Sequence, residues 1–347
     1  MKKKLEYRAL TLTDVENVDE LNNIGVSNWK REFFSELKPN SVLVGCFDND
    51  KIIGCEGYVS YNLLKDEKIV QSHRSERTLV NPEYRGMGIF ESLVNECDSL
   101  ALKCDSHFSW GATSALKPFQ RAGFNADIGF RSYLFIPVKK VWYKRVFKII
   151  SLVKWFKPVL FKGVFKHREL NLIKGLLSEL SAIKGMRYSY SRLIKFRDID
   201  MVQVSDFQKN NHKEYYQIKI DDDFIQWLKI ADDYEFIQLE SDAGCCGYLI
   251  LKTNTLNNYV TIVDVVLSNL EIVQVVSQLA TLAKFQKYDS FFLALNSFNN
   301  VHAEYINSLN NAGVLNKTKA GSFVIKPLLD KSVQLSDLML TDIWLEL

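Results

Sequence analysis

The stretch from residue 78 to residue 90 constrains the fold of this chain more than any other part of the sequence. It reads Thr-Leu-Val-Asn-Pro-Glu-Tyr-Arg-Gly-Met-Gly-Ile-Phe, so an apolar, β-branched run ends at Asn81-Pro82, passes through Gly86 and Gly88, and enters a helix-patterned segment. Glycines permit positive φ angles and keep Cβ atoms away from an approaching group. A strand that feeds a helix through such a turn presents several backbone N–H groups to one point, where the helix dipole adds positive charge. The pattern predicts an α/β unit with a phosphate or pyrophosphate site, to which Arg85 adds a side-chain donor.

The size and composition of the chain suit a soluble globular protein of two domains. It has 347 residues, of which 47% are hydrophobic and 24% are charged, and its formal net charge is +3. This charge is close to balanced, so no nucleic-acid partner is expected. The N-terminus begins with a charged run but lacks the apolar core of a signal peptide, so no secretion signal is predicted.

The cysteines predict neither a metal site nor a disulfide framework. There are six of them, without a Cys-x-x-Cys pair and without histidines at zinc spacing. We therefore expect no metal, and a reducing, cytoplasmic location.

Hydrophobic periodicity predicts alternating strands and helices over the first 136 residues. Strands are expected at 7–12, 41–47, 51–61, 69–80, 106–111 and within 124–136, and helices at 13–23, 29–37, 87–103 and 114–122. From about residue 188 a similar order returns, with strands at 234–240, 247–252, 259–267, 290–295 and 322–325 and helices at 270–285 and 301–309.

Between these two parts, residues 138–168 carry ten Lys or Arg and no Asp or Glu, interleaved with aromatic residues. The lysines recur too often for a bilayer-spanning segment. Three interpretations remain open: helices that join two domains, a basic amphipathic surface that makes peripheral contact with anionic lipid, or positive charge for a diphosphate-bearing substrate.

The string Val80-x-Pro-x-Tyr84-Arg85-Gly86-x-Gly88-Ile89, followed by a helix, resembles the acyl-CoA-binding loop of the GNAT superfamily of acyltransferases. The family signature is Arg/Gln-x-x-Gly-x-Gly/Ala, and here Phe90 replaces the last small residue. The resemblance implies acyl-CoA as co-substrate. It places the pyrophosphate on the loop and the thioester or pantetheine on amides of the preceding strand; the implied residues are Leu79, Val80, Arg85, Gly86, Met87, Gly88, Ile89 and Phe90.

The order of elements also resembles this family, and it implies an α/β (α+β) fold of two GNAT-like domains, each a central mixed sheet flanked by helices. We expect an acyl-CoA domain at 1–137, a basic-aromatic helical connector at 138–187 and a second domain at 188–347. In the second domain Leu267-Ser268-Asn269-Leu270 stands where the first has its glycine loop. With neither glycine nor arginine there, that domain is expected to be degenerate and not to bind CoA.

The resemblance implies direct attack of an amine on the thioester, with a base on the strand before the loop. His73 and Glu76 are the titratable candidates, and strand alternation puts them on opposite faces. Many relatives offer a tyrosine to protonate the leaving thiolate, within Ala-x-x-x-Tyr-x-x-x-Gly-Phe. Here that position is Phe119, and phenylalanine has no proton to donate.

The two-domain layout resembles bacterial GNAT N-acyltransferases that modify amino groups on nucleotide-linked deoxysugars. The implied reaction moves an acyl group from acetyl- or 3-hydroxybutyryl-CoA to a dTDP-linked amino sugar, for surface polysaccharides such as lipopolysaccharide O-antigen. Two alternatives stay open. One is an aminoacyl-tRNA-dependent peptidyltransferase, which would use the basic stretch for tRNA but would not need an intact pyrophosphate loop. The other is a non-catalytic protein that binds a membrane surface or a partner.

Overall fold

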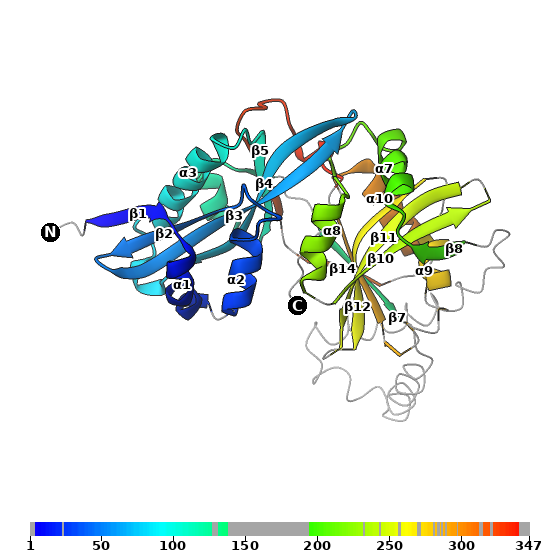
Figure 1. The fold of residues 1–347 in the computed structure, drawn as a ribbon, viewed down its shortest axis with the longest axis horizontal. Helices are drawn as coiled ribbons and strands as arrows, with labels where there is room; N and C mark the ends of the chain where they lie inside the picture. The colour runs from blue at the N-terminus through cyan, green and yellow to red at the C-terminus, as the bar shows by residue number, and fades with distance from the viewer. Residues whose placement is uncertain are drawn as a thin grey trace, which may run out of the picture. The chain divides into compact units, whose positions relative to one another are not determined.

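The computed structural model describes residues 4–22, 24–126, 131–137 and most of 194–339. Within that last stretch the description omits residues 232, 243, 256–257, 269–271, 280–281, 283–284, 286, 289, 297, 312–314 and 320–321. The chain forms two compact units (Figure 1). Unit 1 comprises Met1–Phe130, Met201–Asp232 and Ala320–Leu340, and unit 2 comprises Arg131–Asp200, Asp233–Lys319 and Thr341–Leu347. The connector expected at 138–187 lies outside the described residues.

Unit 1 is built on a mixed sheet. Its described strands are β1 (Leu5–Ala9), β2 (Val42–Asp48), β3 (Lys51–Lys65), β4 (Lys68–Val80), β5 (Phe108–Thr113), β6 (Asn125–Ala126), β9 (Gln217–Ile218) and β15 (Ser322–Pro327). They lie in the order β1-β2-β3-β4-β5-β15-β6, with β9 paired to β3. The β4–β5 pairing is parallel, whereas the others are antiparallel. The described helices of this unit are α1 (Val15–Asn22), α2 (Val26–Phe33), α3 (Ile89–Leu102), α4 (Leu116–Arg121), α7 (Met201–Asn210) and α8 (Asp222–Lys229).

Helix α3 covers one face of this sheet, and α1 and α2 cover the other (Figure 1). The apolar positions of α3 recur at helical spacing, and they form one core cluster with Val44, Cys46, Ile53 and Tyr58 of β2 and β3. On the opposite face a Cβ atom at Gly57 would lie 2.3 Å from the Phe33 ring of α2. The missing side chain at position 57 is therefore what lets α2 pack closely on β3.

Unit 2 has a second mixed sheet, in which the described strands follow the order β14-β7-β13-β12-β11-β10-β8. They are β7 (Arg131–Pro137), β8 (Lys195–Asp198), β10 (Tyr234–Ser241), β11 (Gly244–Asn254), β12 (Tyr259–Leu267), β13 (Ser290–Asn296) and β14 (Leu315–Lys319). Helices α9 (Ile272–Leu279) and α10 (Asn300–Asn311) pack on it around a core rich in valine, leucine and isoleucine. No helix in the described part of the chain is long and apolar enough to cross a membrane.

The predicted fold class is confirmed, because both units are mixed sheets flanked by helices. The placement of the closing strands is different from the prediction. The strands within 124–136 were expected to belong to the first domain, and β6 does, but β7 lies between β13 and β14 in unit 2. Conversely, β15 pairs with β5 and β6 in unit 1. Alternation of apolar and polar residues identifies a strand, but it carries no information about which sheet receives that strand.

Candidate active site

The turn between β4 and α3 has the backbone conformation that its glycines predict. Asn81 accepts a hydrogen bond from the Glu83 N–H at 3.0 Å, which starts the short 3-10 turn Pro82–Tyr84. Gly86 and Gly88 then adopt φ angles of 82° and 74°, in the left-handed region that glycine enters without a Cβ penalty. Gly88 is the N-cap of α3.

This turn exposes a row of backbone donors. Among the described residues, no acceptor receives a hydrogen bond from the N–H groups of residues 86–90. A Cβ atom built on Gly86 or on Gly88 meets no atom within 4 Å. These N–H groups thus have no partner among the described residues and lie at the positive end of the α3 dipole, an arrangement that suits phosphate oxygens.

A cavity of about 690 Å³ adjoins the turn. Most of the predicted binding residues line it, whereas Leu79 and Met87 do not, and the Met87 side chain is half exposed. The remaining wall comes from the end of β4, the 3-10 turn and α4. The lining residues are Thr78, Val80, Tyr84, Arg85, Gly86, Gly88, Ile89, Phe90, Glu91, Ala115, Pro118, Phe119 and Arg121.

The aromatic residues at positions 90 and 119 are packed together at this wall. The ring centroids of Phe90 and Phe119 lie 4.9 Å apart, and Phe124 packs on Phe119 at 5.0 Å. The Phe90 ring is buried in the core, so its size does not obstruct the donors of the turn. The departure from the small-residue signature is therefore compatible with an anion at the turn.

Strand β4 separates from β5 beside the cavity. The parallel pairing joins Ser72, His73 and Arg74 to β5, and in the described residues the β4–β5 ladder does not extend over 75–80. On its other edge β4 stays paired to β3 up to Val80. From residue 75 onward the hydrogen-bonded ladder between the two parallel strands is therefore open, and we call this unpaired stretch beside Leu79 and Val80 the opening.

A β-bulge lies at the start of this opening. Gly57 pairs with Glu76 and Cys55 pairs with Leu79, so Glu56 alone opposes both Arg77 and Thr78. Arg77 has a φ angle of 57°, an uncommon conformation for a residue with a side chain. A bulge changes the alternation of side chains along a strand. As a result Glu76 and Arg77 share the α2 face of β4, whereas Thr78 faces the cavity on the α3 side.

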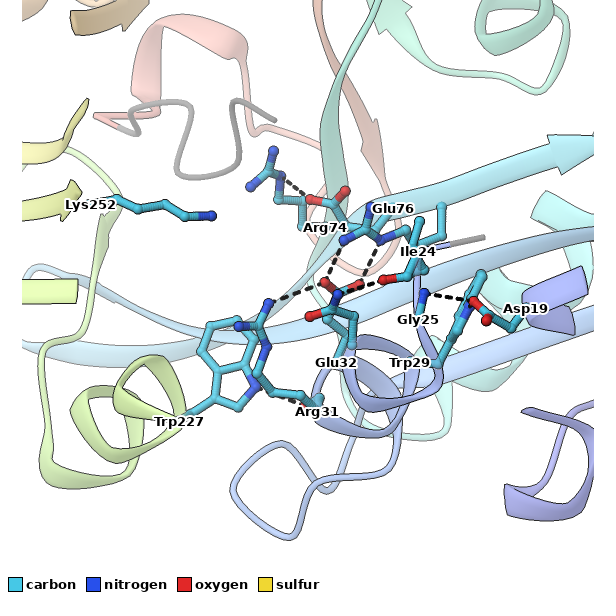
Figure 2. A network of polar contacts seen from close by, with 12 residues as sticks. Asp19, Ile24, Gly25, Trp29, Arg31, Glu32, Arg74, Glu76, Trp227 and Lys252 are labelled. Atoms are coloured by element: carbon cyan, nitrogen blue, oxygen red, sulfur yellow. Dashed lines mark hydrogen bonds and ion pairs between the residues drawn. The ribbon is translucent and has the colours of Figure 1, made fainter. Parts of the chain in front are cut away.

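The bulge is held by a buried ion pair with α2. Arg77 donates from Nε to Glu32 Oε2 at 2.8 Å and from Nη2 to Glu32 Oε1 at 2.7 Å, and the two side chains are 12% and 4% exposed. Figure 2 shows Arg31 and Glu32 of α2 gathered with Arg74 and Glu76 of β4. Bidentate arginine–carboxylate pairs fix geometry as well as charge, so this pair holds Arg77 in its unusual conformation.

His73, one of the two candidate bases, is enclosed. It is fully buried, with Nε2 2.8 Å from the Asn40 carbonyl oxygen and Nδ1 2.8 Å from Ser106 Oγ. A carbonyl only accepts, so Nε2 carries the proton, and Nδ1 accepts from the serine hydroxyl. Burial lowers the pKa of His73 to about 4. Both ring nitrogens are occupied, so this placement favours a structural role.

His73 is expected to make the fold sensitive to acid. Its pKa is lower in the folded chain, so its contribution to stability is present above pH 6.5 and is lost as the pH falls towards 4. The size of this contribution is about 3 kcal/mol. We expect His73→Gln to be less stable at pH 7 but to lose less stability than the wild type between pH 6.5 and pH 4.5. Urea unfolding at both pH values measures this difference, and equal losses in the two proteins would contradict it.

Glu76, the second candidate base, lies on the α2 face of the opening. Its Oε1 is 2.8 Å from Arg74 Nε, and its side chain is 18% exposed. The Arg74 guanidinium lies over the Trp110 ring at 5.4 Å from the centroid. Glu76 is thus the more accessible of the two candidates on the strand.

Glu56 is a buried carboxyl that the sequence pattern alone did not single out. It is 0% exposed in β3 and accepts hydrogen bonds from Ser75 and Thr78 of β4. Burial raises the pKa of Glu56 to about 8, with Glu76 and Asp98 as further negative neighbours. A signal was present in the sequence, because Glu56 is the one charged residue in the apolar run from residue 52 to residue 61.

A second, smaller cavity of about 170 Å³ lies in unit 1 beside Lys38. The Lys38 ammonium donates to the Ser60 carbonyl at 3.0 Å and sits 4.3 Å from the Tyr61 ring centroid and 4.4 Å from that of Trp227. Burial lowers the pKa of Lys38 to about 7. The faces of the Tyr61 and Trp227 rings stabilise the ammonium group in those molecules in which Lys38 is protonated. The space between these aromatic rings is therefore occupied by the side chain of Lys38 itself.

The end of β12 in unit 2 contrasts with the end of β4. The N–H of Ser268, the residue after β12, donates to the Cys246 carbonyl at 3.0 Å. It is therefore already satisfied, unlike the donors of residues 86–90. Asn269 and Leu270 lie outside the described residues, so the degenerate loop of the second domain stays a prediction.

No protein-family model and no curated protein matches the sequence. Solved structures do match the fold. A conserved protein of unknown function from Enterococcus faecalis V583, a probable N-acyltransferase, is similar over 94% of this chain and 74% of its own, with a TM-score of 0.60 and 9% identity.

Two further solved structures agree with this likeness. The Saccharomyces cerevisiae N-myristoyltransferase with bound myristoyl-CoA matches 98% of this chain and 84% of its own, with a TM-score of 0.56 and 11% identity. A GCN5-related N-acetyltransferase from Kribbella flavida matches 94% of this chain and 72% of its own, with a TM-score of 0.54 and 11% identity. At these identities the likeness concerns the fold alone. The chain thus has the fold of the GCN5-related N-acetyltransferases.

Proposed function

We propose that this chain is an N-acyltransferase that takes its acyl group from acyl-CoA. The observation that carries the proposal is the turn at residues 86–90, whose open N–H donors border the cavity of about 690 Å³. A CoA pyrophosphate matches the donors in charge and geometry, and the cavity has room for part of the cofactor. The likeness in fold to a transferase with bound myristoyl-CoA supports the same assignment.

In this proposal the thioester lies in the opening between β4 and β5. The Val80 amide holds pantetheine or polarises the thioester carbonyl as negative charge develops on its oxygen, whereas the Leu79 N–H is directed at Cys55 of β3. Glu76 acts as the base that removes a proton from the amine, directly or through one water. We prefer Glu76 to His73, because both nitrogens of that histidine are already bonded within the protein.

For the acceptor, we propose the amino group of a nucleotide-linked amino deoxysugar, commonly dTDP-linked, on a route to surface polysaccharide such as lipopolysaccharide O-antigen. The donor would then be acetyl- or 3-hydroxybutyryl-CoA. The two-unit architecture supports an acceptor larger than a free amino acid. A second candidate is transfer of a longer acyl chain, favoured by the likeness to the N-myristoyltransferase over most of both chains.

The test is release of free CoA thiol in mixtures of one donor and one amine. The donors are acetyl-, 3-hydroxybutyryl- and myristoyl-CoA, and the amines include dTDP-amino sugars, peptides and polyamines. We expect release with an amino sugar and a short-chain donor. Release with peptides and myristoyl-CoA alone would favour the second candidate, and absence of calorimetric CoA binding would defeat both.

The same assay distinguishes CoA-dependent acyl transfer from the tRNA-dependent alternative. Such an enzyme takes its acyl group from aminoacyl-tRNA, so it would not release CoA and would not need the glycine turn. The exposed donors of residues 86–90 favour CoA over that alternative. A protein that only binds a membrane or a partner would likewise release no thiol with any pair.

A further inference from the structure

A proton-bearing group lies behind the wall of the cavity. Ser75 Oγ is 2.5 Å from Glu56 Oε1, and Thr78 Oγ1 is 2.5 Å from Glu56 Oε2. Both hydroxyls therefore lie within hydrogen-bond distance of the carboxyl, one on each of its oxygens. Burial raises the pKa of Glu56 to about 8, which favours the protonated form of this carboxyl. When Glu56 carries its proton on Oε2, the carboxyl is the donor to Thr78 Oγ1, whereas Thr78 is the donor when Glu56 is ionised.

The two hydroxyl partners of Glu56 differ in what they face. Thr78 lines the cavity beside the turn, whereas Ser75 does not. The Ser75 Cβ instead faces β5, where it would lie 3.3 Å from a Cβ atom at Gly111. Hence the buried carboxyl is hydrogen-bonded to a residue that itself lines the cavity.

The proposed reaction needs such a path. When the tetrahedral intermediate collapses, sulfur leaves as a thiolate, and a proton donor near it lowers the barrier. Phe119, at the position where many relatives have a tyrosine, lines the same cavity and has no proton to give. Thr78 lies two residues before Val80, whose amide is assigned to the thioester end of CoA.

Building on the proposed acyl transfer, we propose that Thr78 protonates the departing CoA thiolate and that Glu56 replaces that proton from behind. In this proposal Thr78 is the catalytic residue, because its hydroxyl would contact the sulfur of CoA bound in the cavity that Thr78 lines. Glu56 acts through Thr78 and is a positioning residue and proton reservoir.

Atoms and charges balance in this step. The C–S bond breaks and its electron pair stays on sulfur, which takes the proton of Thr78 Oγ1 to form the thiol. Thr78 Oγ1 takes the carboxyl proton of Glu56, which becomes a carboxylate. The amine proton leaves on the α2 face, through Glu76 to solvent. Solvent then returns one proton to Glu56 before the next cycle, so the net reaction is amine plus thioester to amide plus thiol.

The charges around Glu56 favour its neutral form. Glu76 of β4 and Asp98 of α3 are negative neighbours, and Asp98 is itself paired to Lys326 of β15 at 2.5 Å. The sulfhydryls of Cys55 and Cys97 stay protonated, because burial and neighbouring carboxylates raise the pKa of both. No described cation forms an ion pair with Glu56.

The first experiment compares Thr78→Val with Thr78→Ser, using acetyl-CoA and the best amine found in the thiol-release panel. Thr78→Val keeps the shape but removes the hydroxyl, so we expect kcat to fall about 100-fold with little change in KM. Thr78→Ser restores the hydroxyl and should recover most of the rate. Ser75→Ala is the matched comparison: it removes a hydroxyl from the same carboxyl, but not from the cavity, and it should lose much less of the rate than Thr78→Val. Equal losses in Ser75→Ala and Thr78→Val would overturn the proposal.

The pH profile tests Glu56 itself. In the wild type, kcat should fall as the pH rises through about 8, because the ionised carboxylate has no proton to pass on. Glu56→Gln should lower kcat and remove this alkaline limb. Ser75→Ala should move the limb to higher pH, because its hydrogen bond lowers the pKa of Glu56. A limb that persists unchanged in Glu56→Gln would overturn the assignment.

A titration of bound CoA tests the same inference without an acceptor. Ultraviolet absorbance reports the thiolate of CoA in complex with the protein. Removing the Thr78 donor should raise the pKa of the bound thiol by about one unit, and Glu56→Gln should lower it, because a negative neighbour is lost. Identical titrations in the wild type and both variants would defeat this inference while CoA binding stands. Failure of the wild type to bind CoA would instead defeat the proposed function.

Discussion

Gly88→Trp is expected to abolish CoA binding and leave the fold intact. Gly88 caps α3 with a φ angle of 74°, and the position of its Cβ opens onto space with no atom within 4 Å. An indole there would occupy the space in front of the donors of residues 86–90, where the pyrophosphate is proposed to bind. We expect calorimetry to show CoA affinity at least 100-fold weaker, a loss of about 2.7 kcal/mol or more.

Two control variants separate occlusion of the site from backbone strain. Gly88→Ala has the same strain, roughly 1–2 kcal/mol for a side chain in the left-handed region, but leaves most of the space open. Gly25→Trp places an indole at another glycine N-cap, that of α2, with a φ angle of 90°. We expect Gly25→Trp to lose stability but to retain CoA binding. Unchanged CoA affinity in a folded Gly88→Trp protein would refute the assignment of the turn.

Glu32→Ala is expected to give the largest loss of stability, about 3–5 kcal/mol. The carboxylate is 4% exposed and receives both hydrogen bonds from Arg77, whose guanidinium is 12% exposed. Without it, a positive charge stays in a desolvated position with its bidentate partner gone. Replacing the whole pair, in Glu32→Leu/Arg77→Met, removes that charge and should recover much of the stability. Urea unfolding followed by circular dichroism measures each free energy.

An exposed ion pair provides the comparison. Asp206 and Lys209 of α7 lie 3.8 Å apart, with side chains 66% and 50% exposed. Asp206→Ala should change the free energy of unfolding by less than about 1 kcal/mol, because solvent screens such pairs. If Glu32→Ala also changed the free energy of unfolding by less than about 1 kcal/mol, burial would not strengthen the Glu32–Arg77 ion pair. The bulge also positions Leu79 and Val80, so we expect Glu32→Ala to lose thiol-release activity even where it remains folded.

Local features of the site could be predicted from the sequence, because they depend on a few neighbouring residues. Asn81, Gly86 and Gly88 each occupy the backbone role that their residue types favour, and α3 begins at Ile89, directly after its glycine cap. The catalytic groups were harder to predict. Its residue type made His73 a candidate base. In the folded chain, however, His73 is buried and both of its ring nitrogens have hydrogen-bond partners.

The bulge and its consequences depended on pairing between strands. Simple alternation along β4 would put Glu76 and Thr78 on one face, and one extra residue opposite Glu56 separates them. That single insertion sends Arg77 to Glu32 and brings Thr78 to both Glu56 and the cavity. Neither Glu32 nor Glu56 is close to the loop in sequence, so their contribution to the site was not visible in any local pattern.

The sequence by itself determined the α/β class, the strand–glycine turn–helix unit and most of the regular elements, because propensity, periodicity and capping act within a few residues of each other. Tertiary structure decided which sheet receives β7 and which receives β15, the bulge at Arg77, and the burial that raises the pKa of Glu56 and lowers that of His73. Strand partners and desolvation depend on groups distant in the chain. The energies of strand pairing and of desolvation arise only when folding brings these distant groups together.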